Sequence, residues 1–325
     1  MPTIRRGIID AANKAYKDLF QSVLEENTDR QLMALTTDVP STAKVEEYDW
    51  FQDFADFRLW QGERKLSDQA AYNHIIRNEK YEATVSMDRE DMDYDRLGKY
   101  EPKIQQLARA WPRLLRSRVA ELIVNGHNPS TPRTPEVSVQ HVSGSPEYVG
   151  YDDEPFFSDT HPNSAGADQS NQTQAQANDA DFDNFDGEDV DAAVEKMQLL
   201  RDDGGRLIDV MPDTLVVGPK NRTAVRRLFQ KETVAEGGDN EYFGMFDQII
   251  VDPYLREVRD AYIFDTSLAL QPIIRQTVNG GPEFASLTSP DSDHVFKNDE
   301  FLYGARAIFG MGYGLWQVGH RIIAA

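Results

Sequence analysis

The side chains best suited to chemistry lie in one short stretch, YDDEPFFSDTHP, at residues 151–162. It brings Asp152, Asp153, Asp159 and His161 close together in sequence. Carboxylates beside an imidazole serve in general acid–base catalysis and in metal binding. No second histidine follows at ligand spacing, and the two adjacent phenylalanines are apolar anchors for a packed loop. We interpret the stretch as a structural loop and keep a hydrolase or metal enzyme as the alternative.

Two other motifs resemble ligand sites but lack essential parts. Asp88, Asp91, Asp93 and Asp95 suggest a calcium loop, yet its ligand spacing, central glycine and terminal glutamate are missing. The glycine pair at 204–205 lacks the lysine and Ser/Thr of a phosphate loop. The chain has no cysteine, which excludes disulfides, thiol catalysis and cysteine-bound zinc. We therefore predict no catalytic residue, no cofactor and no metal, and hence no enzyme.

The negative charge is concentrated in one part of the chain. The net charge is −21, and the stretch from Thr134 to Glu195 holds 15 acidic residues and no Lys or Arg. Nucleic-acid-binding surfaces need clustered positive charge, so this balance argues against one. The chain also lacks an apolar run long enough for a bilayer and the apolar core of a signal peptide. We expect no membrane association and synthesis in the cytoplasm.

Residues 163–189 have low complexity and little apolar content. Such a segment cannot bury enough surface to pack alone, so we expect an exposed or disordered acidic loop. A soluble adaptor that binds basic partners through this loop is a further alternative function.

One long amphipathic helix is predicted over residues 100–124. Apolar side chains recur there at helical spacing, and the core of this helix is expected to contain Ile104, Leu107, Trp111, Leu115 and Val119. Pro112 lies inside the pattern and predicts a kink or a break, because proline removes a backbone donor.

The N-terminal third combines a helix with an aromatic region. Residues 7–25 read as a helix, residues 46–66 as a short helix, and the alternation over 72–87 as a β-hairpin turning at 77–79. Core packing explains the aromatics, and contact with another chain is the alternative, because Trp and Arg favour interface hot spots. The interface candidates are Trp50, Phe54, Phe57, Arg58, Trp60, Arg64, Tyr72 and Tyr81.

The C-terminal half reads as a small α+β region followed by a long strand. Helices are predicted over 190–200 and 221–231, with strands at 207–208, 214–219, 241–252, 261–264 and 273–274. The last strand, 303–318, places Gly310, Gly312 and Gly314 on one face. A strand stripped of side chains on one face indicates a closely approaching backbone, for which we expect the 100–124 helix.

Five stretches occur in an order and spacing that resembles the major head subunit of Mu-like tailed phages and prophages. They are VPSTAKVEEYDWFQDFADFRLWQGER, YEATVSMDREDMDYDRLGKY, YDDEPFFSDTHP, AYIFDTSLALQPIIRQ and YGARAIFGMGYGLWQ. The resemblance covers roughly residues 10–320, and residues 163–189 look like an insertion into it.

The resemblance implies an α+β fold of the Hong Kong 97 capsid type. It implies an N-terminal arm at 1–45, an extended-loop region with a β-hairpin at 46–87 and a peripheral domain at 88–162 with the spine helix 100–124. The acidic loop 163–189, an axial domain at 190–290 and the long peripheral strand at 291–325 would follow.

The implied function is a major capsid protein, found in the virion and in the host cytoplasm during assembly. It would self-assemble into hexamers and pentamers of an icosahedral shell around double-stranded DNA that it does not bind specifically. Further implied partners are a separate scaffolding protein, a portal and a decoration protein. A host-encoded nanocompartment shell of the same fold is the alternative.

Overall fold

The computed structural model describes residues 2–26, 30–51, 71–93, 97–127, 149–163, 166–176, 186–202, 205–233, 238–255 and 258–325. The helices are α1 (Pro2–Glu26), α2 (Arg30–Met33), α3 (Arg89–Asp93), α4 (Glu101–Asn125), α5 (Gly187–Gln198), α6 (Arg222–Phe229) and α7 (Asp293–Asn298). The strands are β1 (Thr36–Pro40), β2 (Val45–Phe51), β3 (Ala71–Arg77), β4 (Glu79–Asp88), β5 (Gln172–Gln174), β6 (Thr214–Val217), β7 (Gln248–Val251), β8 (Ala261–Phe264), β9 (Ile273–Thr277), β10 (Glu283–Leu287), β11 (Glu300–Tyr313) and β12 (Gly319–Ile323).

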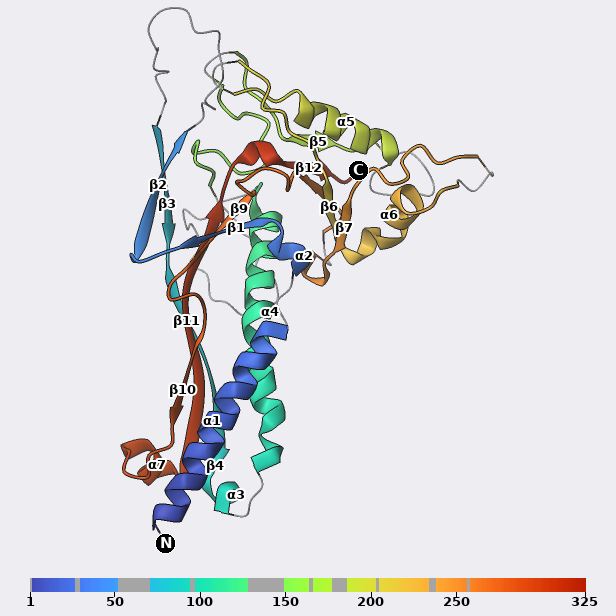
Figure 1. Ribbon diagram of the computed structural model, residues 1–325. Coiled ribbons are helices and arrows are strands. Elements are labelled where there is room, and N and C mark those ends of the chain that lie inside the picture. Colours follow the sequence, from blue (N-terminus) through green and yellow to red (C-terminus); the bar gives the residue numbers. More distant parts are fainter. Residues whose placement is uncertain are drawn as a thin grey trace, which may run out of the picture.

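The molecule has the shape of an L (Figure 1). One arm, which we call the spine, contains α1 and α4 alongside the long strands β4 and β11. The other arm, which we call the wedge, contains α5, α6 and a sheet of short strands. None of the described helices is both long and apolar enough to cross a membrane.

Helix α4 runs unbroken through Pro112, so the break that the sequence predicts there does not occur. A proline inside a helix costs about 3 kcal/mol. Packing on two sides offsets this cost: α1 lies along the first half of α4, and apolar residues on the second half join the largest core. Tertiary contacts therefore decide the course of this helix.

In the spine sheet β1 pairs with β9, and β9 and β10 pair with successive parts of one edge of β11. Strand β4 pairs with the other edge of β11. The β4–β11 ladder is antiparallel and extends from Asp88 opposite Glu300 to Glu79 opposite Phe309. Helix α4 packs on the face of β11 that carries large side chains. Trp111 meets the ring of Phe309 edge-on at 5.0 Å, and the Tyr313 hydroxyl donates to the Leu122 carbonyl at 2.7 Å.

The predicted hairpin over 72–87 is wrong, because its two halves pair with different partners. Strand β3 pairs with β2, whereas β4 pairs with β11. Asn78 lies between β3 and β4, and its side-chain amide donates to Ser41 Oγ at 2.6 Å and to the Ala43 carbonyl at 2.8 Å. Alternating polarity indicates strands but does not reveal their partners.

The short helix predicted over 46–66 is also wrong for residues 46–51, which belong to strand β2. The rest of that prediction lies outside the described residues.

The wedge sheet has the order β5-β12-β8-β6-β7, and this order revises two expectations. Strands β9 and β10 fall within 190–290 but pair with β11 in the spine, whereas the C-terminal β12 belongs to the wedge. The expectation of an exposed loop fails within 169–175, where Asn171 and Ala175 are buried. There β5 pairs in parallel with β12, and Asn171 is fully buried. This polar segment is held by backbone pairing and amide hydrogen bonds, which apolar content does not reveal.

The glycine face of β11 does not contact α4, so that expectation is wrong as well. A Cβ added at Gly310 would lie 2.5 Å from the Arg77 carbonyl oxygen, and one at Gly314 would lie 2.3 Å from that of Gln271. At Gly312 it would meet the Ile76 side chain at 2.7 Å. The close neighbours are thus β3 and the segment before β9, since α4 occupies the opposite, side-chain-bearing face.

Candidate assembly interfaces

The histidine and aspartate that could do chemistry form a closed pair. His161 Nδ1 lies 2.6 Å from Asp152 Oδ2, and both side chains are fully buried. The imidazole stacks on the Trp316 indole with ring centroids 3.9 Å apart and planes 2° from parallel. Burial on all sides leaves a substrate no route to either group.

Asn171 completes this buried network. Its Oδ1 accepts from the Ser158 backbone N–H at 2.9 Å and lies 3.3 Å from His161 Nε2. Its Nδ2 lies within hydrogen-bond distance of the carbonyls of Phe156, Trp316 and Gly319. The network joins 152–171 to the chain segment before β12.

The other two aspartates of the stretch are exposed and lie outside the network. Asp153 adopts a left-handed backbone conformation at φ 64°, and Asp159 accepts a hydrogen bond from Gln172. Among the described residues, no group of three or more His, Asp or Glu side chains is arranged to hold a metal. The geometry therefore favours a structural loop.

The aromatic interface candidates are only partly described. Trp50 and Tyr72 are register partners in the β2–β3 pair, and Phe54, Phe57, Arg58, Trp60 and Arg64 lie outside the described residues. Tyr81 is half-buried; its ring lies 4.6 Å from that of Phe309 and its hydroxyl donates to Glu79. Tyr81 thus contacts its own spine, and its role between subunits stays a prediction.

The five α4 residues named from the sequence face the interior to different degrees. Ile104 and Leu107 pack with α1, and Leu115 and Val119 join the core shared with the wedge. Trp111 is half-buried and packs against the same core as Leu115 and Val119. These contacts lie within one chain.

Several exposed apolar side chains escaped the sequence reasoning. Phe296 in α7 is 83% exposed, Met211 58% and Phe243 47%. Large exposed apolar side chains commonly mark contact surfaces. Phe296 had a usable signal, because it follows Val295 in the short helix DHVFKN and two adjacent helical positions rarely share one buried face.

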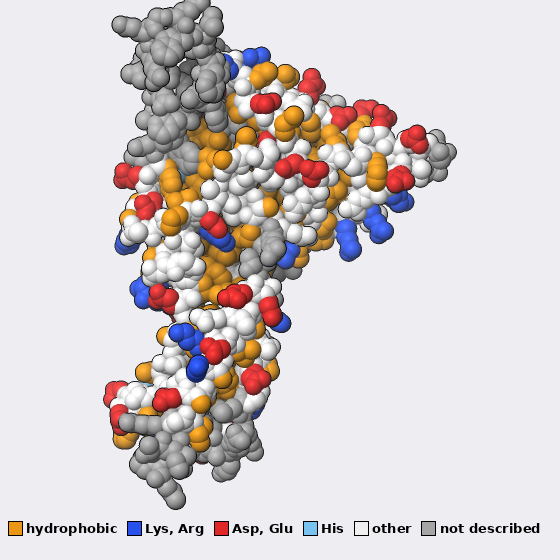
Figure 2. All heavy atoms as spheres, viewed as in Figure 1, with side chains coloured by type: hydrophobic (Ala, Val, Ile, Leu, Met, Phe, Trp, Pro, Cys, Tyr) orange, Lys and Arg blue, Asp and Glu red, His pale blue; other side chains and the backbone are white. Residues whose placement is uncertain are grey.

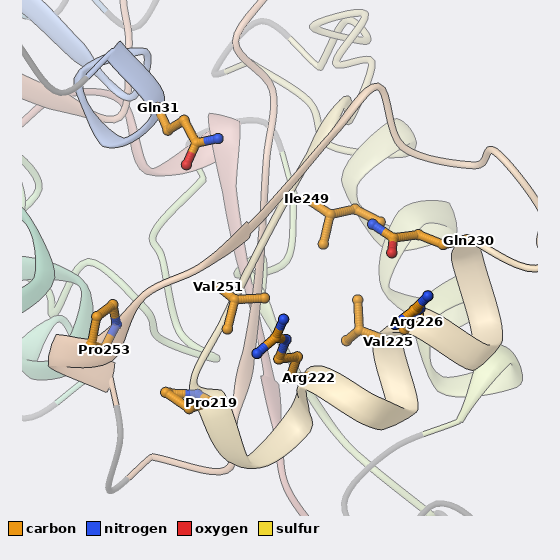
Figure 3. A pocket seen from close by; sticks show the side chains of 9 residues that line it. All are labelled: Gln31, Pro219, Arg222, Val225, Arg226, Gln230, Ile249, Val251 and Pro253. Atoms are coloured by element: carbon orange, nitrogen blue, oxygen red, sulfur yellow. The ribbon is translucent and has the colours of Figure 1, made fainter.

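A groove of about 590 Å³ lies between α6 and the edge strand β7 (Figure 3). Val225, Ile249 and Val251 form its apolar side, and Arg222 and Arg226 project from α6 along it. Among the described strands, β7 pairs with β6 and forms an edge of the wedge sheet. Apolar lining, two guanidinium groups and an open strand edge suit the binding of a polypeptide.

The two rims of the wedge carry opposite charge. Figure 2 shows Lys and Arg side chains along the lower rim, and mainly Asp and Glu side chains along the upper one, with some Lys and Arg at its end nearest the spine. Four exposed cationic side chains lie in α6 or within two residues of its end: Arg222, Arg226, Arg227 and Lys231. No acidic residue interrupts residues 219–231. We call these four side chains the basic rim.

The upper rim is an acidic cluster around Tyr242 at the start of α5. Burial, and then Asp191, Glu241, Glu188 and Asp186, raise the pKa of the Tyr242 hydroxyl. Burial and Glu241 also raise the pKa of Asp191. Upward shifts of this kind are expected where several carboxylates lie close together. We call these four acids the acidic rim.

The sequence matches the family model described as the Mu-like prophage major head subunit gpT over residues 9–185, 180–255 and 257–323. The match runs through 163–185, the segment that looked like an insertion. The major capsid protein of Escherichia phage Mu is 23% identical over 310 residues, which are 95% of this chain and 72% of that protein. A Mu-like prophage FluMu major head subunit of Haemophilus influenzae is 22% identical over 321 residues, 99% of this chain and 73% of that protein.

Solved structures confirm the α+β capsid fold. A subunit in the procapsid of bacteriophage JBD30 superposes with a TM-score of 0.59 at 22% identity, covering 98% of this chain and 75% of that chain. A virus-like particle from Pyrococcus furiosus gives a TM-score of 0.51 at 9% identity, covering 95% and 98%. The fold is therefore shared by particles of different origin, and only the family match distinguishes among them.

Proposed function

Because the chain belongs to the family of Mu-like prophage major head subunits, we propose that its copies form the hexamers and pentamers of an icosahedral shell around double-stranded DNA. It is a structural protein and no enzyme: the major capsid protein of a Mu-like phage, located in the virion. The family match carries this conclusion, because it covers nearly the whole chain.

Surface chemistry supports association of many copies. Phe296 and Phe243 expose large apolar area at two places on the molecule, and the rims of the wedge carry unlike charges. We propose that the wedge is the axial domain, which meets its copies at the five- and six-fold axes. The spine is the peripheral domain, and the β2–β3 pair leads into the extended loop that reaches a neighbour.

The partners are proposed on the same basis. A separate scaffolding protein assists assembly in the host cytoplasm, and a portal and a decoration protein complete the head. Double-stranded DNA fills the shell without specific binding, which the net charge of −21 supports because an acidic wall repels phosphates.

Negative-stain electron microscopy tests the proposal. The chain is purified after expression alone and after expression with the neighbouring phage genes. Closed shells, tubes or ring-shaped capsomers are expected in at least one preparation. A uniform monomer or dimer in both preparations contradicts the proposal.

A further inference from the structure

The charge on the wedge is arranged so that one rim of the molecule complements the other. Arg222 and Arg226 form no ion pair within the part of the chain that the structure describes, and the same holds for Glu188 and Glu241. A single chain thus exposes cationic side chains at Arg222 and Arg226 and anionic ones at Glu188 and Glu241 that form no ion pairs with one another. Charge separated in this way favours contact between copies.

Ring symmetry determines which surfaces can meet. In a closed ring of identical subunits each contact is heterologous, so one surface of a copy meets a different surface of the next copy. The wedge narrows away from the spine, with α5 along one side and α6 along the other (Figure 1). Rotation about an axis near its narrow end places the α6 side of one copy against the α5 side of its neighbour.

We propose that the basic rim of one subunit binds the acidic rim of the next subunit around each capsomer, and that this ion-pair contact sets the ring register. The inference rests on the proposed function, since it names the contact by which the shell's rings close. Arg222 and Arg226, beside the groove between α6 and β7, are the cationic side of the contact. Asp191 and Glu241, with the exposed Phe243 close by, are the anionic side.

Two double variants test the contact by reversing the charge of the two side chains named on each side of it. Arg222→Glu with Arg226→Glu places acids opposite Asp191 and Glu241, and Asp191→Arg with Glu241→Arg places cations opposite Arg222 and Arg226. Each variant alone is expected to form closed shells with a yield reduced about tenfold or more, because at every ring contact the reversed side chains meet side chains of like charge. All four side chains are exposed, so circular dichroism and the unfolding midpoint of the free subunit should remain at wild-type values.

Mixing the two variants provides a rescue that depends on ring parity. Copies that alternate around a ring place an acidic rim against a basic rim at every contact, so hexamers should return. A pentamer has an odd number of subunits and must keep one like-charge contact, so pentamers and closed shells should stay rare. A chain carrying all four substitutions should regain shells, since its rims are complementary again.

The outcomes separate this inference from the proposed function. If wild-type protein forms no particles under any condition, the proposed function fails. If wild-type protein forms shells and both double variants do so equally well, the shell stands and the rim contact is wrong. Sedimentation of assembled particles and class averages of capsomers distinguish these results.

Discussion

Asn171 shows how a single polar side chain can hold two distant parts of this chain together. It is fully buried and connects the segment before β12 with the loop that carries Phe156 and Ser158. A buried amide satisfies several backbone groups at once, and no apolar residue of similar size can replace it. This explains how a segment with little apolar content folds into the wedge.

Replacing Asn171 with alanine should therefore lower the free energy of unfolding by about 2–3 kcal/mol, because buried carbonyls and an N–H lose their partner. Urea unfolding of the free subunit followed by tryptophan fluorescence measures the change. Gln174→Ala is the matched control, since Gln174 lies in the adjoining strand β5 with an exposed side chain. Its effect should stay within about 0.5 kcal/mol. Equal effects of the two substitutions would show that the buried network contributes little.

Two buried histidines predict how stability depends on pH. Burial lowers the pKa of His320 to about 3 and that of His74 to about 4. The unfolded chain, with a histidine pKa near 6.5, binds more protons than the folded chain between these values. Stability should therefore fall as pH drops below about 6.5, by about 2 kcal/mol per histidine between pH 7 and pH 5.

His320→Gln should flatten this pH dependence, measured as unfolding free energies at several pH values. The control is Thr173→Val, which removes the hydroxyl 2.9 Å from His320 Nε2 but retains the imidazole. The control should be less stable at every pH with an unchanged slope. An unchanged slope in His320→Gln would rule out His320 as a source of the acid sensitivity.

At the scale of elements, β11 is a long strand with a different neighbour on each face. Its large side chains meet α4, and its glycines admit the backbone of β3 and of the segment before β9. The chain can thus pass from the β2–β3 pair into the spine sheet at close range. That crossing connects the extended-loop region to the rest of the subunit.

Gly310→Ala should destabilise the subunit by about 1–3 kcal/mol, because the new methyl group would overlap the Arg77 carbonyl oxygen. Gly304→Ala on the same strand is the matched control. Its methyl group would meet the movable Thr84 hydroxyl at 3.3 Å, so only a small change is expected. Thermal unfolding of the two purified variants compares them. If Gly304→Ala destabilised the subunit more than Gly310→Ala, the close approach of the Arg77 carbonyl would not explain why position 310 is a glycine.

Helical periodicity identified α4 and α6 from the sequence, because an amphipathic helix buries one stripe of side chains whatever lies opposite. Alternation of side chains located the strand β11 and its glycine face, although the strand ends at Tyr313 and not at the predicted residue 318. It did not find the partners of β3 and β4, nor which element meets the glycines. Strand pairing depends on residues far apart in sequence, and a period of two is the same for every partner.

The candidate site residues show the same difference between local features, which the sequence reveals, and long-range ones, which it does not. The sequence favoured a structural loop around His161 over a catalytic one, because ligand spacing is a local property, and in the structure His161 and Asp152 form a buried pair. It missed the two charged rims, which combine α5, α6 and the 238–247 segment into surfaces that exist only after folding. A local motif can be recognised in the sequence, whereas a surface built from segments far apart in the chain can be recognised only in the folded structure.

At the scale of the whole molecule, the two ends of the L should serve different steps of assembly. The charged rims lie on the wedge, while α7 with Phe296 lies at the far end of the spine (Figure 1). In the proposed assembly, a contact at the wedge closes rings, and a contact at the spine end joins one ring to the next. Substitutions at the two ends should therefore stop assembly at different stages.

Phe296→Ser tests this separation. The side chain is 83% exposed, so the free subunit should keep its stability within about 0.5 kcal/mol. Hexamers should still form, but closed shells should be fewer by about tenfold, because an aromatic contact between rings is lost. Lys297→Ser is the control, since it alters the same helix and removes only an exposed ion pair with Asp293.

Electron microscopy and sedimentation of the two variants, each expressed with the neighbouring phage genes, separate rings from closed shells. Full shells from Phe296→Ser would show that α7 contributes no contact between rings. Loss of hexamers as well as shells would instead place α7 within the ring contact and contradict the division of labour along the L. The division of labour is supported only if Phe296→Ser forms rings but no closed shells. Losing a contact outside the capsomer leaves ring closure intact, whereas losing a contact within it does not.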